Sequence, residues 1–172
     1  MTSRSPRRSL WFPLVLLAAA VAAAAWFFTR DRDEAQIRAL VEELALHLSK
    51  SAGEAPGITL GKVAGLEKFF APQVELVFPR EKFHRTVEPR EIVTKAAAWR
   101  NFVREVKFRV SDFAFLARTR DTATAEGVGL LRGRTGSRDE AVDDSRGVEM
   151  EFVKSGGRWR IRRIAVRDVL QK

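Results

Sequence analysis

Four arginines stand beside a tryptophan near the end of the chain, in the stretch EFVKSGGRWRIRR of residues 151–163. Guanidinium groups next to an indole ring are typical of surfaces that bind phosphates and stack on nucleic-acid bases. Binding of this kind needs cations that are not already paired inside the protein. The chemistry open to this stretch therefore depends on whether acidic partners lie near its arginines: Arg158, Arg160, Arg162 and Arg163.

The same stretch predicts a β-hairpin, and its register decides the pairing. If residues 154–157 form the connection, alternation places four apolar side chains on one face: Phe152, Met150, Trp159 and Ile161. The other face then carries two facing pairs of opposite charge, Glu151 with Arg160 and Glu149 with Arg162. Each pair contributes about 0.2–1 kcal/mol. Because the arginines have partners and the chain contains no tyrosine, we expect no nucleic-acid partner.

The chain has few of the side chains that usually bind metal ions. There is no cysteine, and the only histidines, His47 and His84, are far apart in the sequence. The stretch GRTGSRDEAVDDSRG, residues 133–147, gathers four acidic residues whose spacing matches no calcium loop: Asp139, Glu140, Asp143 and Asp144. We therefore predict a long, charged, solvated loop there, with no metal site and no cofactor.

The first part of the chain is apolar enough to cross a membrane. Leu10 to Phe28 is nineteen residues without a charge, which as a helix spans about 28 Å against a hydrocarbon core of about 30 Å. Three arginines precede it, so the N-terminus is expected in the cytoplasm. A cleavable signal peptide is the competing interpretation, because the Ala-rich run offers small-x-small sites. The length of the run and the bulky Trp26, Phe27 and Phe28 favour a retained anchor.

This anchor sets the expected organisation. We predict a basic cytoplasmic N-terminus in residues 1–9, a transmembrane anchor in 10–28, a linker in 29–33 and one folded domain in 34–172. The domain is then periplasmic or otherwise extracytoplasmic, held at the inner membrane by a single span. The excess of arginine over lysine and the Ala-rich anchor favour a bacterial source with a GC-rich genome. Without the three N-terminal arginines, 28 lysines and arginines stand against 22 acidic residues, and this net charge of +6 is expected to draw the exported part toward anionic lipid headgroups.

Period and turn signals predict the elements of the domain. Residues 33–50 form a helix with an apolar stripe, a loop follows at 51–57, and a short helix at 62–71 leads to a strand at 73–78. A further helix begins at Pro89 and runs to about residue 103. Four strands, 106–117, 122–134, 147–154 and 158–169, complete an antiparallel meander. A bulge at Arg162 or Arg163 is required because Ile161 and Ile164 both face inward.

This order of elements resembles the nuclear transport factor 2-like superfamily, which includes SnoaL-like polyketide cyclases and ketosteroid isomerases. The stretches LEKFFAPQVELVF and KSGGRWRIRRIAVRDV are similar to its helix-to-strand step and its terminal hairpin. The resemblance covers about residues 34–170. It implies an α+β fold in which a curved antiparallel or mixed sheet forms a cone around about three helices. An apolar cavity would open at the wide end of that cone.

The resemblance also implies where a site would lie. Five residues are the candidates to bind a ligand in the cavity: Trp99, Phe108, Asp112, Met150 and Trp159. Enzymes of the family use a carboxylate or a His/Asp pair as general base, and the alternative catalytic set here is His84, Glu126 and Asp168. The absence of tyrosine removes the oxyanion donor that the isomerases use.

The favoured interpretation is a non-catalytic, membrane-anchored domain. It would bind a small apolar ligand or act as an interaction module in an envelope protein complex, since the periplasmic components of type IV secretion machines have a similar layout. The anchor makes membrane lipid a further partner. Members of the family commonly dimerise through the sheet, so the resemblance also implies a homodimer. The alternative is a cavity acid/base enzyme of the lyase or isomerase type.

Overall fold

The computed structural model describes residues 31–135 and 140–168. The chain divides into two compact units, residues 1–36 and 37–172, and the account below concerns the second. The proposed anchor at residues 10–28 lies outside the described residues. Within the ranges that are described, no helix is long and apolar enough to span a bilayer.

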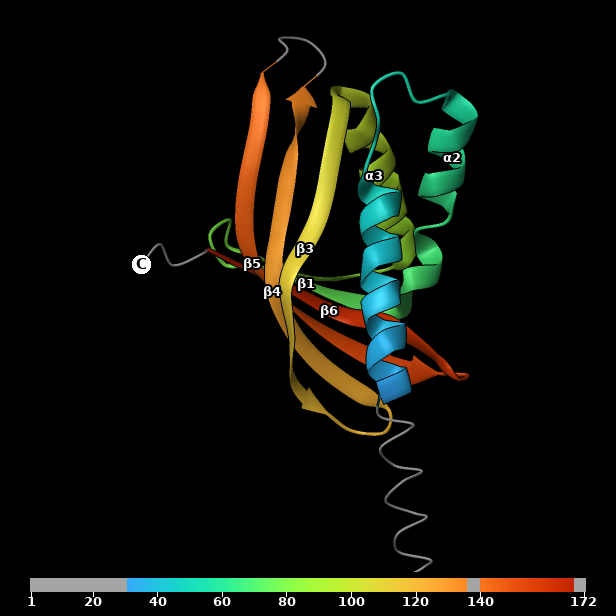
Figure 1. The fold of residues 1–172 in the computed structure, drawn as a ribbon, viewed down its shortest axis with the longest axis vertical. Helices are drawn as coiled ribbons and strands as arrows, with labels where there is room; N and C mark the ends of the chain where they lie inside the picture. Colours follow the sequence, from blue (N-terminus) through green and yellow to red (C-terminus); the bar gives the residue numbers. More distant parts are fainter. Residues whose placement is uncertain (1–30, 136–139, 169–172) are drawn as a thin grey trace, which may run out of the picture. The chain divides into compact units, whose positions relative to one another are not determined.

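Helices and a single sheet make up this unit. Residues 31–48 form the first helix, of which the part from Ile37 on belongs to this unit. It is followed by α2 (Pro56–Ala64) and a 3-10 turn, η1 (Glu67–Phe69). The remaining elements are β1 (Phe70–Phe78), β2 (Phe83–Val87), α3 (Pro89–Phe102), β3 (Val103–Arg118), β4 (Thr122–Thr135), β5 (Ala141–Ser155) and β6 (Arg158–Asp168). The sheet has the order β2-β1-β6-β5-β4-β3, and β1 and β6 are its parallel pair. Figure 1 shows the sheet curving beside the helices, which confirms the predicted α+β class.

Two predicted elements near the start of the domain were wrong. The short helix lies at Pro56–Ala64 and not at 62–71, because Pro56 occupies the first helical turn, where its missing N–H costs nothing. The predicted strand begins earlier than residue 73, because Phe70, Ala71 and Pro72 already belong to β1. Pro72 is tolerated there because the pairing of β1 with β6 is interrupted between Phe70 and Glu75. The edge strand β2 was not predicted at all.

The long loop predicted at residues 133–147 is also wrong. Strand β4 continues to Thr135 and β5 begins at Ala141, so most of the charged residues belong to strands. Arg132 faces Asp143 across these strands, and Arg132 Nε lies 3.2 Å from Asp143 Oδ2. Opposite charges at facing positions favour strand pairing, which explains how a polar stretch extends the sheet.

The β5–β6 hairpin turns more tightly than predicted. Gly156 and Gly157 have φ values of +58° and +76°, a left-handed pair that permits a two-residue turn and makes Ser155 face Arg158. Every pairing up to the bulge is therefore displaced by two positions from the predicted register. A displacement of two keeps each side chain on its predicted face. The predicted bulge is confirmed, because Phe152 faces Ile161 whereas Glu151 faces Arg163.

The predicted charge pairs of this hairpin change with its register. Glu151 accepts hydrogen bonds from Arg162 at 2.7 Å and from Arg163 at 3.2 Å. Glu149 accepts from Arg163 at 3.1 Å and from Arg167 at 2.6 Å. The pairs Glu151–Arg160 and Glu149–Arg162 were thus wrong in detail. The expectation that acidic residues of β5 partner the arginines of β6 holds for Arg162, Arg163 and Arg167. It was wrong for Arg158 and Arg160, which form no hydrogen bond or ion pair with a described residue.

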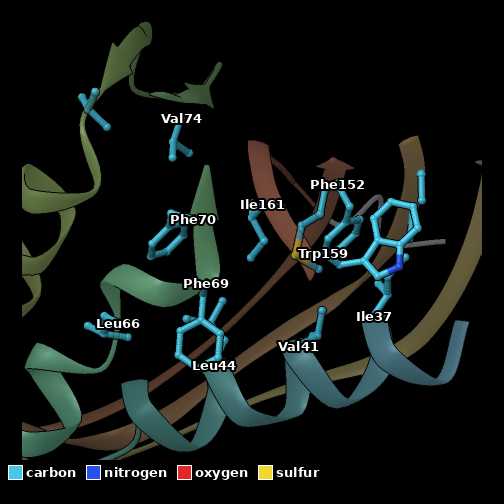
Figure 2. Packing of buried hydrophobic residues seen from close by; sticks show 14 residues of the cluster. Ile37, Val41, Leu44, Leu66, Phe69, Phe70, Val74, Phe152, Trp159 and Ile161 are labelled. Atoms are coloured by element: carbon cyan, nitrogen blue, oxygen red, sulfur yellow. The ribbon is translucent and has the colours of Figure 1, made fainter. Parts of the chain in front are cut away.

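The core lies between the first helix and the concave face of the sheet. Figure 2 shows Ile37, Val41 and Leu44 on one face of that helix, directed at side chains of the sheet and of η1. The opposing residues are fully or almost fully buried: Phe69, Phe70, Val74, Phe152, Trp159 and Ile161. The 3.6-residue stripe of the helix and the two-residue alternation of the strands meet in this cluster.

Gly133 offers a test of how closely β3 and β4 approach. A Cβ at this position would lie 2.3 Å from the Glu105 carbonyl oxygen, which is backbone and cannot swing aside. At Gly147 the nearest atom would be 3.6 Å away, an ordinary contact. We expect Gly133→Ala to lower the free energy of unfolding by about 1–3 kcal/mol and Gly147→Ala to change it by less than about 0.5 kcal/mol. Urea unfolding followed by tryptophan fluorescence measures both, and equal losses would contradict this geometry.

Candidate functional site

An apolar cavity of about 290 Å³ lies between the first helix and the concave face of the sheet. The helix contributes Val41, Leu44 and Leu48, and the inward positions of the strands contribute the rest. The lining from the strands consists of Phe78, Phe108, Val110, Gly129, Leu131, Asp144, Arg146, Val148, Met150, Ile164 and Val166. This volume lies just below the range of about 300–1,000 Å³ that is usual for small-molecule sites.

The polar side chains of the lining come from neighbouring positions of β5. Arg146 Nε donates to Asp144 Oδ2 at 3.0 Å, and Arg146 Nη1 donates to Glu81 Oε1 at 2.7 Å. The bond from Arg146 lowers the pKa of Glu81, and the bond to Glu81 raises the pKa of Arg146. These groups therefore stay charged at neutral pH. A guanidinium cannot act as a base in a protein, so this rim positions ligands better than it moves protons.

Two of the five predicted ligand-binding residues line the cavity, Phe108 and Met150. Trp159 is 4% exposed and belongs to the packed core beside it. Trp99 lies on α3 and is 36% exposed, away from the cavity lining. Asp112 occupies a break in the β3–β4 register with a φ of +52° and is exposed. The bulge turns Asp112 out of the inward alternation that carries Phe108 and Val110.

The alternative catalytic residues do not converge among the described residues. His84 is exposed on β2, and its Nε2 lies 2.7 Å from Glu75 Oε1. Glu126 is exposed on β4. Four inter-strand steps of about 4.8 Å separate β2 from β4, so the strands that carry His84 and Glu126 are about 19 Å apart as measured along the sheet. Asp168 ends β6, where its backbone faces Arg146, and its side chain lies outside the description.

The sequence analysis missed a buried ionic cluster at the ends of the helices. Arg100 of α3 is 1% exposed and forms a short ion pair with Glu54, whose side chain is 4% exposed. Lys62 Nζ lies 2.5 Å from Glu54 Oε2, and Thr59 Oγ1 donates to Glu54 Oε1 at 2.8 Å. Burial raises the pKa of Glu54, but the bonds from Lys62 and Thr59 and the charge of Arg100 outweigh it and lower the pKa to about 2.

This cluster satisfies backbone carbonyls that a helix end leaves without partners. Arg100 Nη1 donates to the carbonyl oxygens of His47 at 2.8 Å and Ser49 at 3.2 Å, at the end of the first helix. Lys50 Nζ donates to those of Arg100 at 2.7 Å and Val103 at 2.8 Å, at the end of α3. The burial of Arg100 could have been predicted from the sequence, because helical periodicity places it on the same inward face of α3 as Val93 and Ala96. Glu54 stands in a loop with no period, and no single-sequence signal marks it.

Metal binding finds no support in the described ranges. No group of three or more histidine, cysteine or acidic side chains in those ranges could hold an ion. The buried carboxylate of Glu54 is already occupied by two cations and a hydroxyl. The cluster is therefore a structural element, and the cavity is the candidate site.

Comparison with known proteins agrees with this fold. No protein-family model and no curated protein matches the chain. A candidate scytalone dehydratase of Novosphingobium aromaticivorans superposes with a TM-score of 0.69 at 16% identity, covering 84% of this chain and 89% of that one. A candidate dehydratase of the NTF2-like family from Streptomyces avermitilis gives 0.63 at 14%, covering 82% and 99%. The protein Kfla4162 of Kribbella flavida gives 0.69 at 12%, covering 83% and 95%.

At these identities the likeness shows the fold alone. The chain therefore has the NTF2-like fold, in its six-stranded curved form with helices against the concave face. This supports the fold, a curved sheet beside helices, that the terminal hairpin and the order of elements predicted. The chemistry of the cavity has to be argued from the residues of this chain.

Glu54 predicts an acid-dependent loss of stability. Its folded pKa of about 2 is depressed, so its contribution is complete above the ordinary pKa near 4.5 and disappears as the pH falls toward 2. Over that window the wild-type free energy of unfolding should fall by about 3 kcal/mol more than that of Glu54→Gln. At neutral pH this substitution should cost about 3–5 kcal/mol, because Arg100 is left buried with less compensation.

The exposed Glu42→Gln is the matched control and should keep the wild-type pH profile. Urea unfolding at a series of pH values gives the three curves. If Glu54→Gln and wild type lose stability in parallel between pH 5 and about pH 2, the pKa of Glu54 is not depressed in the fold.

Proposed function

We propose that this domain binds a small apolar molecule in the cone cavity and does not catalyse a reaction. The observation that carries the proposal is the lining, in which apolar side chains from one helix and five strands surround about 290 Å³. Burial of an apolar ligand contributes about 25 cal/mol per Å² of surface removed from water. The three charged side chains of the rim, Arg146, Asp144 and Glu81, are hydrogen-bonded to one another. Their role is therefore to orient a ligand.

The enzyme alternative needs a general base within hydrogen-bond reach of a ligand in the cavity. The described residues supply no imidazole there, and the cavity carboxylate, Asp144, is hydrogen-bonded to Arg146 at the rim. Two structurally similar proteins carry the name dehydratase, but at 16% and 14% identity this says nothing of the reaction here. The binding function is therefore the better-supported of the two.

We also propose that residues 10–28 anchor the domain at the bacterial inner membrane, with the domain outside the cytoplasm. The support is the uncharged run of nineteen residues and the three arginines that precede it. An anchor would raise the effective concentration of the domain beside lipids and envelope proteins. An envelope-complex partner and a homodimer remain predictions of the sequence.

Met150 is a natural reporter of cavity binding, because Met1 is the only other methionine of the chain. With methionine methyl groups labelled by ¹³C, titration with 1-naphthol should shift the Met150 resonance through the ring current of the bound ligand. Leu131→Trp fills the cavity and should abolish the shift. Leu130→Trp points to the opposite face of β4 and should preserve it. An unchanged Met150 resonance in the wild type would overturn the binding proposal.

Anchoring can be tested with reporters fused after Lys172. Alkaline phosphatase should be active and β-galactosidase inactive, because the first needs the disulfides that form outside the cytoplasm. Deletion of residues 10–28 should reverse the pattern and release the chain from the membrane fraction. An active β-galactosidase fusion of the full chain would contradict the proposed location of the domain outside the cytoplasm.

A further inference from the structure

A second hollow lies directly beside the cavity. It is an open groove of about 870 Å³ between the first helix and the β3–β4 edge. Val41, Phe108 and Val110 line both the groove and the cavity. These three side chains thus form the boundary between the two spaces. Leu46, which is 68% exposed, continues the apolar floor of the groove along the helix.

The rim of the groove is strongly basic. Its cations are Lys50, Lys107, Arg109, Arg132 and Arg134, against the acidic Glu42 and Glu105. Several of these cations already have partners: Lys50 donates to two carbonyl oxygens, Arg132 pairs with Asp143, and Arg134 lies 3.7 Å from Glu105. Lys107 and Arg109 are exposed and have no hydrogen bond or ion pair with any described residue. The groove therefore offers two cations to an external anion.

The register of β3 and β4 places two cations of the groove side by side. Lys107 on β3 faces Arg132 on β4 directly. Like charges at facing positions destabilise a sheet, and an anion bound beside them would relieve the repulsion. The Arg146 rim of the cavity carries a net negative charge, because the two carboxylates of Asp144 and Glu81 outnumber the single guanidinium of Arg146. An acidic headgroup is thus attracted toward the groove and repelled from the Arg146 rim.

We infer that the groove and the cavity together bind a single-chain anionic amphiphile. Its apolar chain passes Val41, Phe108 and Val110 into the cavity, and its acidic headgroup stays in the groove at the edge of the sheet. Lys107 and Arg109 alternate with Phe108 and Val110 along β3, so they line the groove from the other face of this edge strand and hold the headgroup there. This inference rests on the proposed function, since it names the class of ligand that the cavity takes. Carboxylate and phosphate headgroups share the required chemistry, and both accept charge-assisted hydrogen bonds from lysine and arginine.

The test uses the full-length chain in nanodiscs of a zwitterionic phospholipid, with the Met150 methyl group as reporter. Decanoate, decyl phosphate and decanol are titrated separately, so that the chain length is constant and only the headgroup changes. Both anions should bind more tightly than decanol, and raising the ionic strength should reduce this difference. Preference for decyl phosphate over decanoate would assign the natural headgroup to a phosphate, and the reverse to a carboxylate.

The double variant Lys107→Gln/Arg109→Gln should weaken binding of the two anions at least about fivefold and leave decanol unchanged. Arg90→Gln/Lys95→Gln removes two exposed cations from α3, outside the lining of the groove, and controls for net charge. Equal affinities for decanol and decanoate, or equal losses in the two double variants, would overturn the inference while the proposed function stands. Failure of all three ligands and of 1-naphthol to shift Met150 would overturn both.

Discussion

The buried ion pair of Arg100 and Glu54 holds the ends of the helices in place. Arg100 donates hydrogen bonds to the last carbonyl oxygens of the first helix. Glu54 forms ion pairs with Arg100 of α3 and with Lys62 of α2. Taking these charges out of water is costly, and the cost is offset only when the geometry also satisfies the remaining donors and acceptors. Here Thr59 and three backbone carbonyls complete most of the set, with Arg100 Nε left without a partner. The cluster therefore stabilises this arrangement of the three helix ends, because separating them would leave buried charges without partners.

That arrangement determines how the free edge of the sheet is covered. The segment held by Arg100 continues into Lys50, whose backbone exchanges two hydrogen bonds of 2.8 Å with Val106 on β3. Ser49 Oγ accepts from the Phe108 amide at 3.0 Å, and farther along the edge Arg38 donates to the Phe113 carbonyl at 3.1 Å. An uncovered edge strand invites pairing with other chains. The same contacts hold the helix across the concave face, so the wall of the cavity depends on the ionic cluster.

Local patterns in the sequence were sufficient for much of this fold. The helix stripe of Ile37, Val41 and Leu44, the helix start at Pro89 and the bulge before Ile164 all follow from period and turn rules that act over a few residues. The register of the terminal hairpin did not follow, because both a two-residue and a four-residue connection keep the same faces inward. Glu54 could not be found either, since its role depends on Arg100 and Lys62, which are brought to it by the fold. His84 and Glu126 are separated for the same reason, by a strand order that the sequence does not display.

The distribution of charge across the sheet links this architecture to binding. Inward positions of the strands are apolar around the cavity, whereas Glu75, Arg163 and Glu149 form a ladder of ion pairs across β1, β6 and β5. Most charges of the sheet therefore neutralise one another away from the cavity. Lys107 and Arg109 depart from this pattern, and both line the groove between the first helix and β3. A cavity that presents no described acid–base pair, next to cations that no described group neutralises, favours recognition of a charged amphiphile over chemistry on it.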